Sequence, residues 1–148
     1  MKIQKYVEKS LLFAIGTSYD AIWRNLNTQL KKEECNFLQA MILISLFFEE
    51  SETVTPSRLA DTFYTSRGNL SHCVTYLEKR GWVKRQLDEK DARSYQVILK
   101  PEGRKVATRL IKVIDRIEDF FEDSFGKQPL SSTITSLAKI GELARHKP

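Results

Sequence analysis

The sequence contains few cysteines, histidines and glycines. Its 148 residues include two cysteines, two histidines and six glycines. It has no glycine-rich phosphate loop, no HExxH helix and no Gly-x-Ser-x-Gly elbow. With His72 and His146 as the two histidines, a Ser/His/Asp or Cys/His site has few possible members. We therefore expect neither an enzyme, nor a cofactor, nor a metal site.

Long apolar runs are also missing, and we expect no export signal. No segment approaches the roughly 18 apolar residues that a membrane span requires. Cys35 and Cys73 do not form the framework of a secreted disulfide-rich protein. A reducing cytoplasm is the expected location, and neither a membrane nor a metal is an expected partner.

Length and charge favour one globular domain, residues 1–148, with a polyanionic partner. The chain is 41% hydrophobic and 29% charged, with a net charge of +5 and a pI near 9.2. Residues 54–100 carry nine lysines and arginines against five acids, a net of +4. Most of the basic excess therefore lies in the middle of the chain. The alternative is a soluble protein that is merely basic.

Apolar residues at steps of three and four predict long helices at both ends of the chain. One helix is expected over about the first 30 residues. A second, capped by Asn36, is so apolar that it should be buried centrally. Beyond Gly103 we expect another long helix, followed by a final helix capped near Ser131.

Two short helices are predicted in the basic segment. Thr55 is a good N-cap, and Pro56 suits the first helical position because its missing N–H costs nothing there. Ser66 caps the next helix, which stops at Gly81. Because about three residues join the two helices, the segment is typical of a helix-turn-helix.

The second of these helices has two distinct faces at 100° per residue. Its core face carries Leu70, Cys73, Val74 and Leu77. Its opposite face carries short polar groups, cations and a glycine that permits close approach: Gly68, His72, Thr75 and Lys79, flanked by Arg67, Ser71 and Tyr76. Such a face suits the major groove of DNA, where base edges are read by hydrogen bonds. The alternative is a solvated helix face.

A hairpin with a charged tip follows this helix directly. The stretches "WVKRQL" and "SYQVILK" are rich in β-forming residues and enclose the loop "DEKDAR". The expected fold is therefore mainly α with a small β-hairpin, a winged helix-turn-helix. Asp91 would hold the loop while Arg93 reaches phosphates or the minor groove. The alternative is an ordinary charged hairpin.

The segment "RLADTFYTSRGNLSHCVTYLEKRGWVKRQLDEKDARSYQVILKPEG" resembles the DNA-binding core of the MarR family of transcription regulators. That family has a helix-turn-helix ending in LExxG(L/W)V, a wing bearing Asp-x-Arg, and L(T)xxG at the start of a long helix. This chain departs from the pattern at Tyr64 and Thr65, where the family often has glycine and an aliphatic residue. It departs again at Lys100, which replaces a threonine cap.

The resemblance implies a homodimer built from long flanking N- and C-terminal helices, residues 1–34 and 103–148, around a winged-helix core over 36–100. The alternative for these helices is an intramolecular cap on a monomer. The family also implies a small aromatic effector in a crevice, for which the candidate residues are Tyr19, Trp23, Phe37 and Phe47. Aromatic residues at helical spacing are more often core.

The predicted function is that of a homodimeric, sequence-specific repressor that binds a pseudo-palindromic operator and is released by an effector. The DNA-binding candidates are Ser66, Arg67, Gly68, Asn69, Ser71, His72, Thr75, Lys79, Lys84, Arg85 and Arg93. One alternative is a winged helix that binds protein without specific DNA binding. The other is an oxidant sensor acting through Cys35, whose place beside "KKEE" suggests an exposed thiol, whereas Cys73 should be buried and inert.

Overall fold

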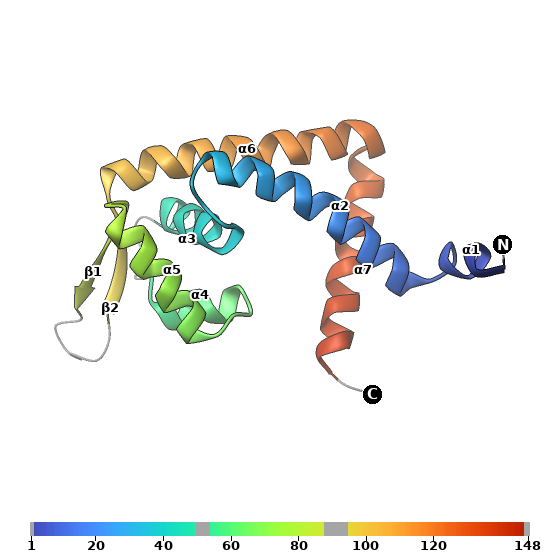
Figure 1. The fold of residues 1–148 in the computed structure, drawn as a ribbon, viewed down its shortest axis with the longest axis horizontal. Helices are drawn as coiled ribbons and strands as arrows, with labels where there is room; N and C mark the ends of the chain where they lie inside the picture. Colours follow the sequence, from blue (N-terminus) through green and yellow to red (C-terminus); the bar gives the residue numbers. More distant parts are fainter. Residues whose placement is uncertain (1, 50–53, 88–94, 147–148) are drawn as a thin grey trace. The chain divides into compact units, whose positions relative to one another are not determined.

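The computed structural model describes residues 2–49, 54–87 and 95–146, which are mostly helical with one two-stranded hairpin (Figure 1). They fall into two compact units, residues 1–111 and 112–148. The predicted winged helix-turn-helix fold is confirmed, while the division into one domain with two regions stays a prediction. The elements are α1 (Lys2–Val7), α2 (Leu11–Lys32), α3 (Phe37–Phe48), α4 (Pro56–Thr62), α5 (Arg67–Lys79), β1 (Val83–Leu87), β2 (Tyr95–Leu99), α6 (Pro101–Phe125) and α7 (Lys127–Arg145).

Helix α3 lies at the centre of the first unit. Its start is fixed by a capping box, in which Asn36 accepts from the backbone N–H of Gln39 at 2.9 Å and the Gln39 side chain accepts from the backbone of Asn36 at 2.8 Å. Because α3 is apolar on nearly all sides, it is covered on nearly all sides. Its buried side chains are Ala40, Ile42, Leu43, Ile44 and Leu46.

The prediction of one helix over the first 30 residues is wrong. Helix α1 ends at Val7 and α2 begins at Leu11, with Ser10 extended between them (φ −93°, ψ 118°). Serine competes with helical hydrogen bonding and favours helix ends. No residue of α1 is buried, so packing within the described chain does not hold it in line with α2.

The hairpin pairs β1 with β2 antiparallel, with Val83 opposite Leu99 and Arg85 opposite Val97. Val83 and Val97 are almost fully buried and anchor the inner face of the hairpin. The other edge of β2 is also held, because the backbone N–H of Val97 donates to the carbonyl of Val54 at 3.0 Å. The segment before α4 therefore supports the hairpin.

Gly103 permits a close backbone approach between α6 and the start of the hairpin. A Cβ atom at this position would lie 2.0 Å from the carbonyl oxygen of Trp82, and that oxygen accepts from the backbone N–H of Lys100 at 2.9 Å. No side chain fits there. Helix α6 begins at Pro101, two residues before Gly103, because proline suits the first position of a helix.

The predicted start of the last helix near Ser131 is wrong. Helix α7 begins at Lys127, after Gly126 turns the chain with a left-handed φ of 84°. Pro129 is tolerated because the first turn of a helix leaves its N–H groups unpaired. Across the described ranges, no helix has the length and apolar character needed to cross a membrane.

We predict that Gly103→Ala lowers the free energy of unfolding by about 3 kcal/mol, because the new Cβ overlaps the Trp82 carbonyl. Urea denaturation of the full chain measures this loss. Gly68→Ala is the control, since the nearest atom to its Cβ is the Ser66 Oγ at 3.9 Å. Equal stability of the two variants would contradict the prediction.

Candidate nucleic-acid interface

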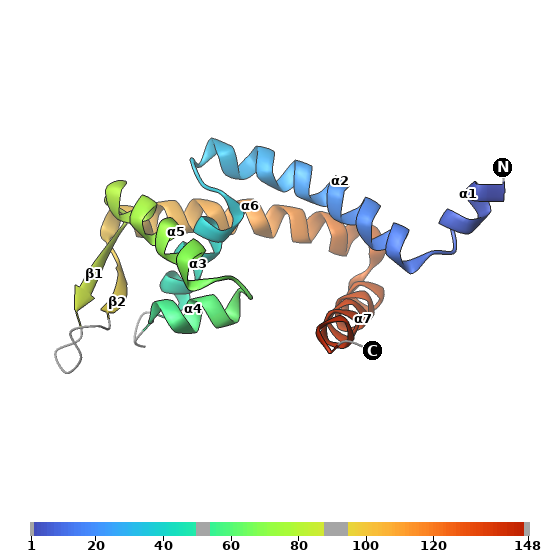
Figure 2. The same cartoon turned by 60° about the horizontal axis from the view of Figure 1, so that its bottom comes forward.

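Helices α4 and α5 form a capped pair joined by a short turn (Figure 2). As predicted, Thr55 caps α4 and Pro56 is its first residue; the Thr55 hydroxyl accepts from the Arg58 N–H at 3.3 Å. The Ser66 hydroxyl accepts from the Asn69 N–H at 3.1 Å at the start of α5. These caps satisfy N–H groups that a helix start leaves unpaired and fix where each helix begins.

Tyr64 gives the turn between α4 and α5 its shape. It adopts a left-handed backbone with φ 49° and is 76% exposed. Bulky residues rarely adopt this conformation, which glycine takes at no cost. Tyr64 stands where the MarR-family pattern often has glycine, which adopts this conformation without strain.

The core face of α5 is the one predicted, whereas Thr75 and Tyr76, expected on the outward face, are half-buried. Leu70, Cys73, Val74 and Leu77 are buried. The outward residues are exposed and include no acid over residues 66–79, all of which are described: Ser66, Arg67, Gly68, Asn69, Ser71, His72 and Lys79. An outward face of amide, hydroxyl, imidazole and cationic groups offers donors and acceptors to base edges and positive charge to phosphates.

Arg85 joins the hairpin to α5. Its guanidinium pairs with the Glu78 carboxylate at 2.6 Å and donates to the Thr75 hydroxyl at 2.7 Å. The backbone N–H of Arg85 also donates to Glu78 at 3.0 Å, and the guanidinium lies 5.2 Å from the centre of the Tyr95 ring. Predicted DNA contacts Thr75 and Arg85 are therefore bonded to each other, in a half-buried position. This contact fixes the angle between the hairpin and α5.

Lys84 lies on the opposite face of β1, since successive strand residues alternate in direction. Its side chain is exposed, whereas that of Arg85 is 28% exposed. Asp91 and Arg93, the predicted loop residues, lie outside the described residues.

Trp23 and Phe37 line an open pocket of about 300 Å³ between α2, the start of α3 and α5. Their rings meet edge to face at 4.7 Å. Three amide side chains complete the polar lining: Asn27, Asn36 and Asn69. Of the other predicted ligand residues, Tyr19 stacks on Trp23 at 5.2 Å outside the lining, and Phe47 lies under the Arg104 guanidinium at 5.1 Å.

Both cysteines are buried. The expectation of an exposed Cys35 is wrong, because it is 4% exposed in the turn between α2 and α3, where its N–H donates to the Leu30 carbonyl at 3.1 Å. Burial, followed by the nearby Glu33 carboxylate, raises the pKa of the Cys35 thiol to about 12. Burial also raises the pKa of Cys73. Neither thiol is poised as the reactive thiolate.

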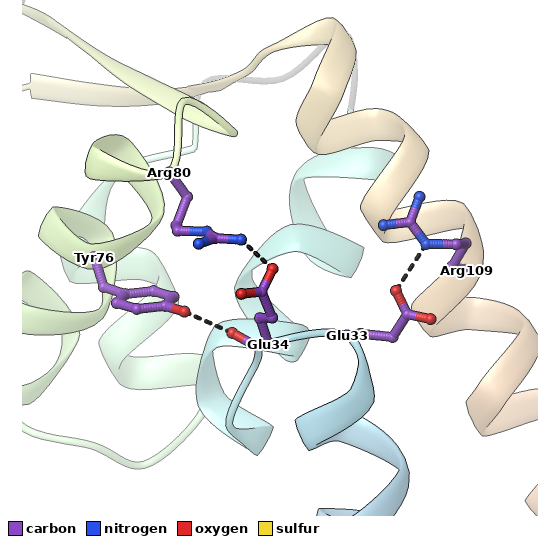
Figure 3. A network of polar contacts seen from close by, with 5 residues as sticks. All are labelled: Glu33, Glu34, Tyr76, Arg80 and Arg109. Carbon is purple, nitrogen blue, oxygen red and sulfur yellow. Dashed lines mark hydrogen bonds and ion pairs between the residues drawn. The ribbon is translucent and has the colours of Figure 1, made fainter.

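Sequence reasoning missed a polar network on Glu33 and Glu34 that includes Tyr76, Arg80 and Arg109 (Figure 3). Its partners are separated by 42 to 76 positions, so no local pattern could reveal it. In the described part of the chain, no group of three or more His, Cys, Asp or Glu side chains could hold a metal ion.

The capped helix pair and its antiparallel hairpin define a winged helix-turn-helix protein. A sequence profile of the MarR family matches residues 36–94. The chain is 24% identical over 132 residues to the HTH-type transcriptional regulator SarZ of Staphylococcus aureus, covering 89% of this chain and 86% of SarZ. The winged helix-turn-helix segment of this chain is therefore similar to that of the MarR family, and SarZ, which most of the chain resembles, is a transcriptional regulator.

Two solved structures have the same fold. The S. aureus MepR–DNA complex matches with a TM-score of 0.82 at 15% identity, covering 90% of this chain and 97% of that one. The transcriptional repressor CouR, from Rhodococcus jostii RHA1, bound to a 23-mer DNA duplex matches with a TM-score of 0.81 at 21% identity, covering 90% and 94%. At these identities the likeness establishes the fold.

We predict that Arg85→Ala costs about 1–2 kcal/mol of stability, because it leaves the Glu78 carboxylate without its charged partner. Lys84→Ala removes the same charge from the exposed face and should cost less than about 0.5 kcal/mol. Urea denaturation of both variants measures the difference. Equal losses would show that Arg85 does not hold the hairpin to α5.

We predict that both thiols of the native protein react with a disulfide reagent at pH 8 at least about 100-fold more slowly than in denaturant, since burial suppresses the thiolate. Ellman's reagent measures both rates. A rapidly reacting thiol in the native protein, lost in Cys35→Ser, would restore the oxidant-sensing alternative.

Proposed function

We propose that this protein is a transcriptional regulator that binds a specific duplex DNA sequence as a homodimer, with α5 in the major groove. One observation carries the proposal: the exposed face of α5 is polar and cationic, its one acid, Glu78, is half-buried and paired with Arg85, and buried apolar side chains hold the helix from behind. A helix presented in this way is suited to reading base edges. The DNA-bound structures of MepR and CouR support it.

The outward residues divide into two roles. Asn69 and His72 carry groups able to hydrogen-bond base edges, and Gly68 allows the backbone close to the groove. Arg67, Lys79 and Lys84 are exposed cations suited to phosphates. Arg85 acts on DNA through Thr75 and the angle of the hairpin.

The residues that join β1 to β2 would act as a wing in this proposal. Arg93 would anchor each half-site from this wing, and Asp91 would stabilise the wing itself. The position beside α5 supports this role, because β1 starts where α5 ends and Arg85 holds the two together.

Exposed apolar side chains support the homodimer. Within the first unit most of them lie on α1 and α2, and within the second they lie on α6 and α7: Ile3, Tyr6, Leu11, Leu12, Phe13, Tyr19, Ile22, Phe120, Phe125, Ile134, Leu137 and Leu143. Apolar surface of this extent favours a partner. A two-fold dimer would cover it and place two α5 helices about one DNA turn apart, matching a pseudo-palindrome.

A small aromatic effector is proposed for the pocket that Trp23 and Phe37 line. Aromatic walls with three amides favour an aromatic ligand that carries hydrogen-bonding groups. The structure of CouR with p-coumaroyl-CoA supports an effector of this class. Asn69 belongs both to this lining and to the outward face of α5. In the proposal, the ligand disfavours the DNA-binding arrangement and so releases a repressor.

A winged helix that binds protein is the alternative function. It predicts weak interaction with DNA, without sequence preference. Selection of bound fragments from genomic DNA by the purified full chain decides between the two, followed by release tests with aromatic compounds. Enrichment of one inverted-repeat sequence supports the regulator, and no enrichment supports the alternative.

We predict different responses from two exposed residues of α5. Arg67→Ala should weaken binding to all duplexes and lower the slope of log affinity against log salt by about 0.9, because one phosphate contact is lost. Asn69→Ala should cost about 1–3 kcal/mol on the selected duplex and leave the slope unchanged. Fluorescence anisotropy at several salt concentrations measures both.

Gly68→Ala is the matched control for fold. The protein leaves room for the new Cβ, so stability should hold while affinity for DNA falls. If all three variants bind DNA like the wild type, α5 is not the reading helix.

A further inference from the structure

We infer that the turn between α2 and α3, residues Glu33 and Glu34, sets the orientation of α5 for DNA binding, with Glu34, Tyr76 and Arg80 as positioning residues. The inference rests on the proposed function and deepens it. These side chains lie at the C-terminal end of α5, away from the exposed N-terminal turns that would read DNA. They would therefore act on DNA through the helix.

Glu34 holds the last turn of α5 in two ways (Figure 3). Its backbone carbonyl accepts from the Tyr76 hydroxyl at 2.7 Å, and its carboxylate pairs with the Arg80 guanidinium. The two contacts come from positions one helical turn apart on α5. Together they fix the position of the helix end and, with it, the tilt of the helix.

The backbone of Glu34 is itself unusual. Its φ of 56° lies in the left-handed region, where a non-glycine residue persists when its surroundings impose the conformation. The neighbours supply that constraint: Glu33 is the C-cap of α2, Cys35 is buried, and Asn36 begins the capping box of α3. A turn fixed on both sides is a firm support for another helix.

The same turn is tied to α6. Glu33 pairs with Arg109 at 2.7 Å, and the Glu33 side chain is 20% exposed. Arg80 also packs over the Trp82 ring at 4.9 Å, and Tyr76 meets that ring edge to face at 6.4 Å. Two adjacent glutamates thus connect α2, α5, α6 and the start of the hairpin.

The contacts that Glu34 makes with the C-terminal end of α5, called here the C-terminal anchor, affect the whole helix because α5 is long. Its 13 residues span about 20 Å. A tilt of about 5° at Arg80 would move the first turn by about 2 Å, enough to break hydrogen bonds to bases, which tolerate a few tenths of an ångström. Loosening the anchor should therefore reduce recognition without removing any group that touches DNA.

The anchor also gives the candidate pocket a route to α5. Trp23 and Asn27 line the pocket from α2, the helix that ends at this turn. A ligand that shifts α2 would shift Glu34, and with it the end of α5. Regulation by the pocket should then depend on the Glu34 contacts.

The test is Glu34→Asn. Asparagine accepts a left-handed backbone and keeps the carbonyl for Tyr76, but it carries no charge and is too short to reach Arg80. Losing an acid should by simple electrostatics tighten DNA binding. The positioning role predicts weaker binding to the selected duplex instead. The ratio of the affinities for the selected and a scrambled duplex should fall by about tenfold, while the slope of log affinity against log salt stays unchanged. Fluorescence anisotropy measures both affinities.

Glu102→Gln is the matched control, since it removes an acid from an exposed ion pair with Lys105. Its ratio should equal that of the wild type. Tyr76→Phe removes a single hydroxyl and should lower the ratio in the same direction, with native unfolding cooperativity retained. In the Glu34→Asn background, Arg80→Gln should cause no further loss of the ratio.

The outcomes separate this inference from the proposed function. A wild-type protein without preference for any duplex overturns the proposed function and this inference with it. A wild-type preference that Glu34→Asn and Tyr76→Phe both retain overturns the inference alone.

Discussion

The orientation of α5 depends first on the burial of one side of that helix. Leu70, Val74 and Leu77 are completely covered, and Cys73 nearly so. Burying each such side chain contributes about 1.5–3 kcal/mol, so α5 cannot rotate without exposing apolar surface. Rotation is the motion that would hide the polar face. Core packing, rather than any contact of the outer side chains, therefore determines which residues of α5 meet a partner.

Polar contacts then fix what packing leaves free. The caps at Thr55 and Ser66 set where α4 and α5 begin. Arg85 sets the angle of the hairpin, and Glu34, in the turn between α2 and α3, holds the end of α5. Each contact joins elements that are distant in sequence or starts an element at one residue. Most exposed residues of α5, such as Arg67, His72 and Lys79, are consequently available for DNA.

The features that the sequence predicted correctly are those that depend on local chemistry. Caps at Asn36, Thr55 and Ser66, the stop at Gly81 and the periodic core face of α5 all depend on neighbouring residues, and all are confirmed. The break at Ser10 and the start of α7 were missed, because apolar periodicity continues across the first and a glycine turn sets the second. The burial of Cys35 and the Arg85 and Glu34 contacts depend on tertiary packing, which no local pattern encodes.

The central claim is that two copies of α5 read the major groove of one duplex. Methylation interference on the selected duplex tests it most directly, because methylation of guanine N7 blocks the major groove. Two clusters of interfering guanines, related by the operator's symmetry and centred about 10 base pairs apart, are the predicted result. Binding that tolerates methylation at every guanine of the selected sequence would contradict recognition by α5.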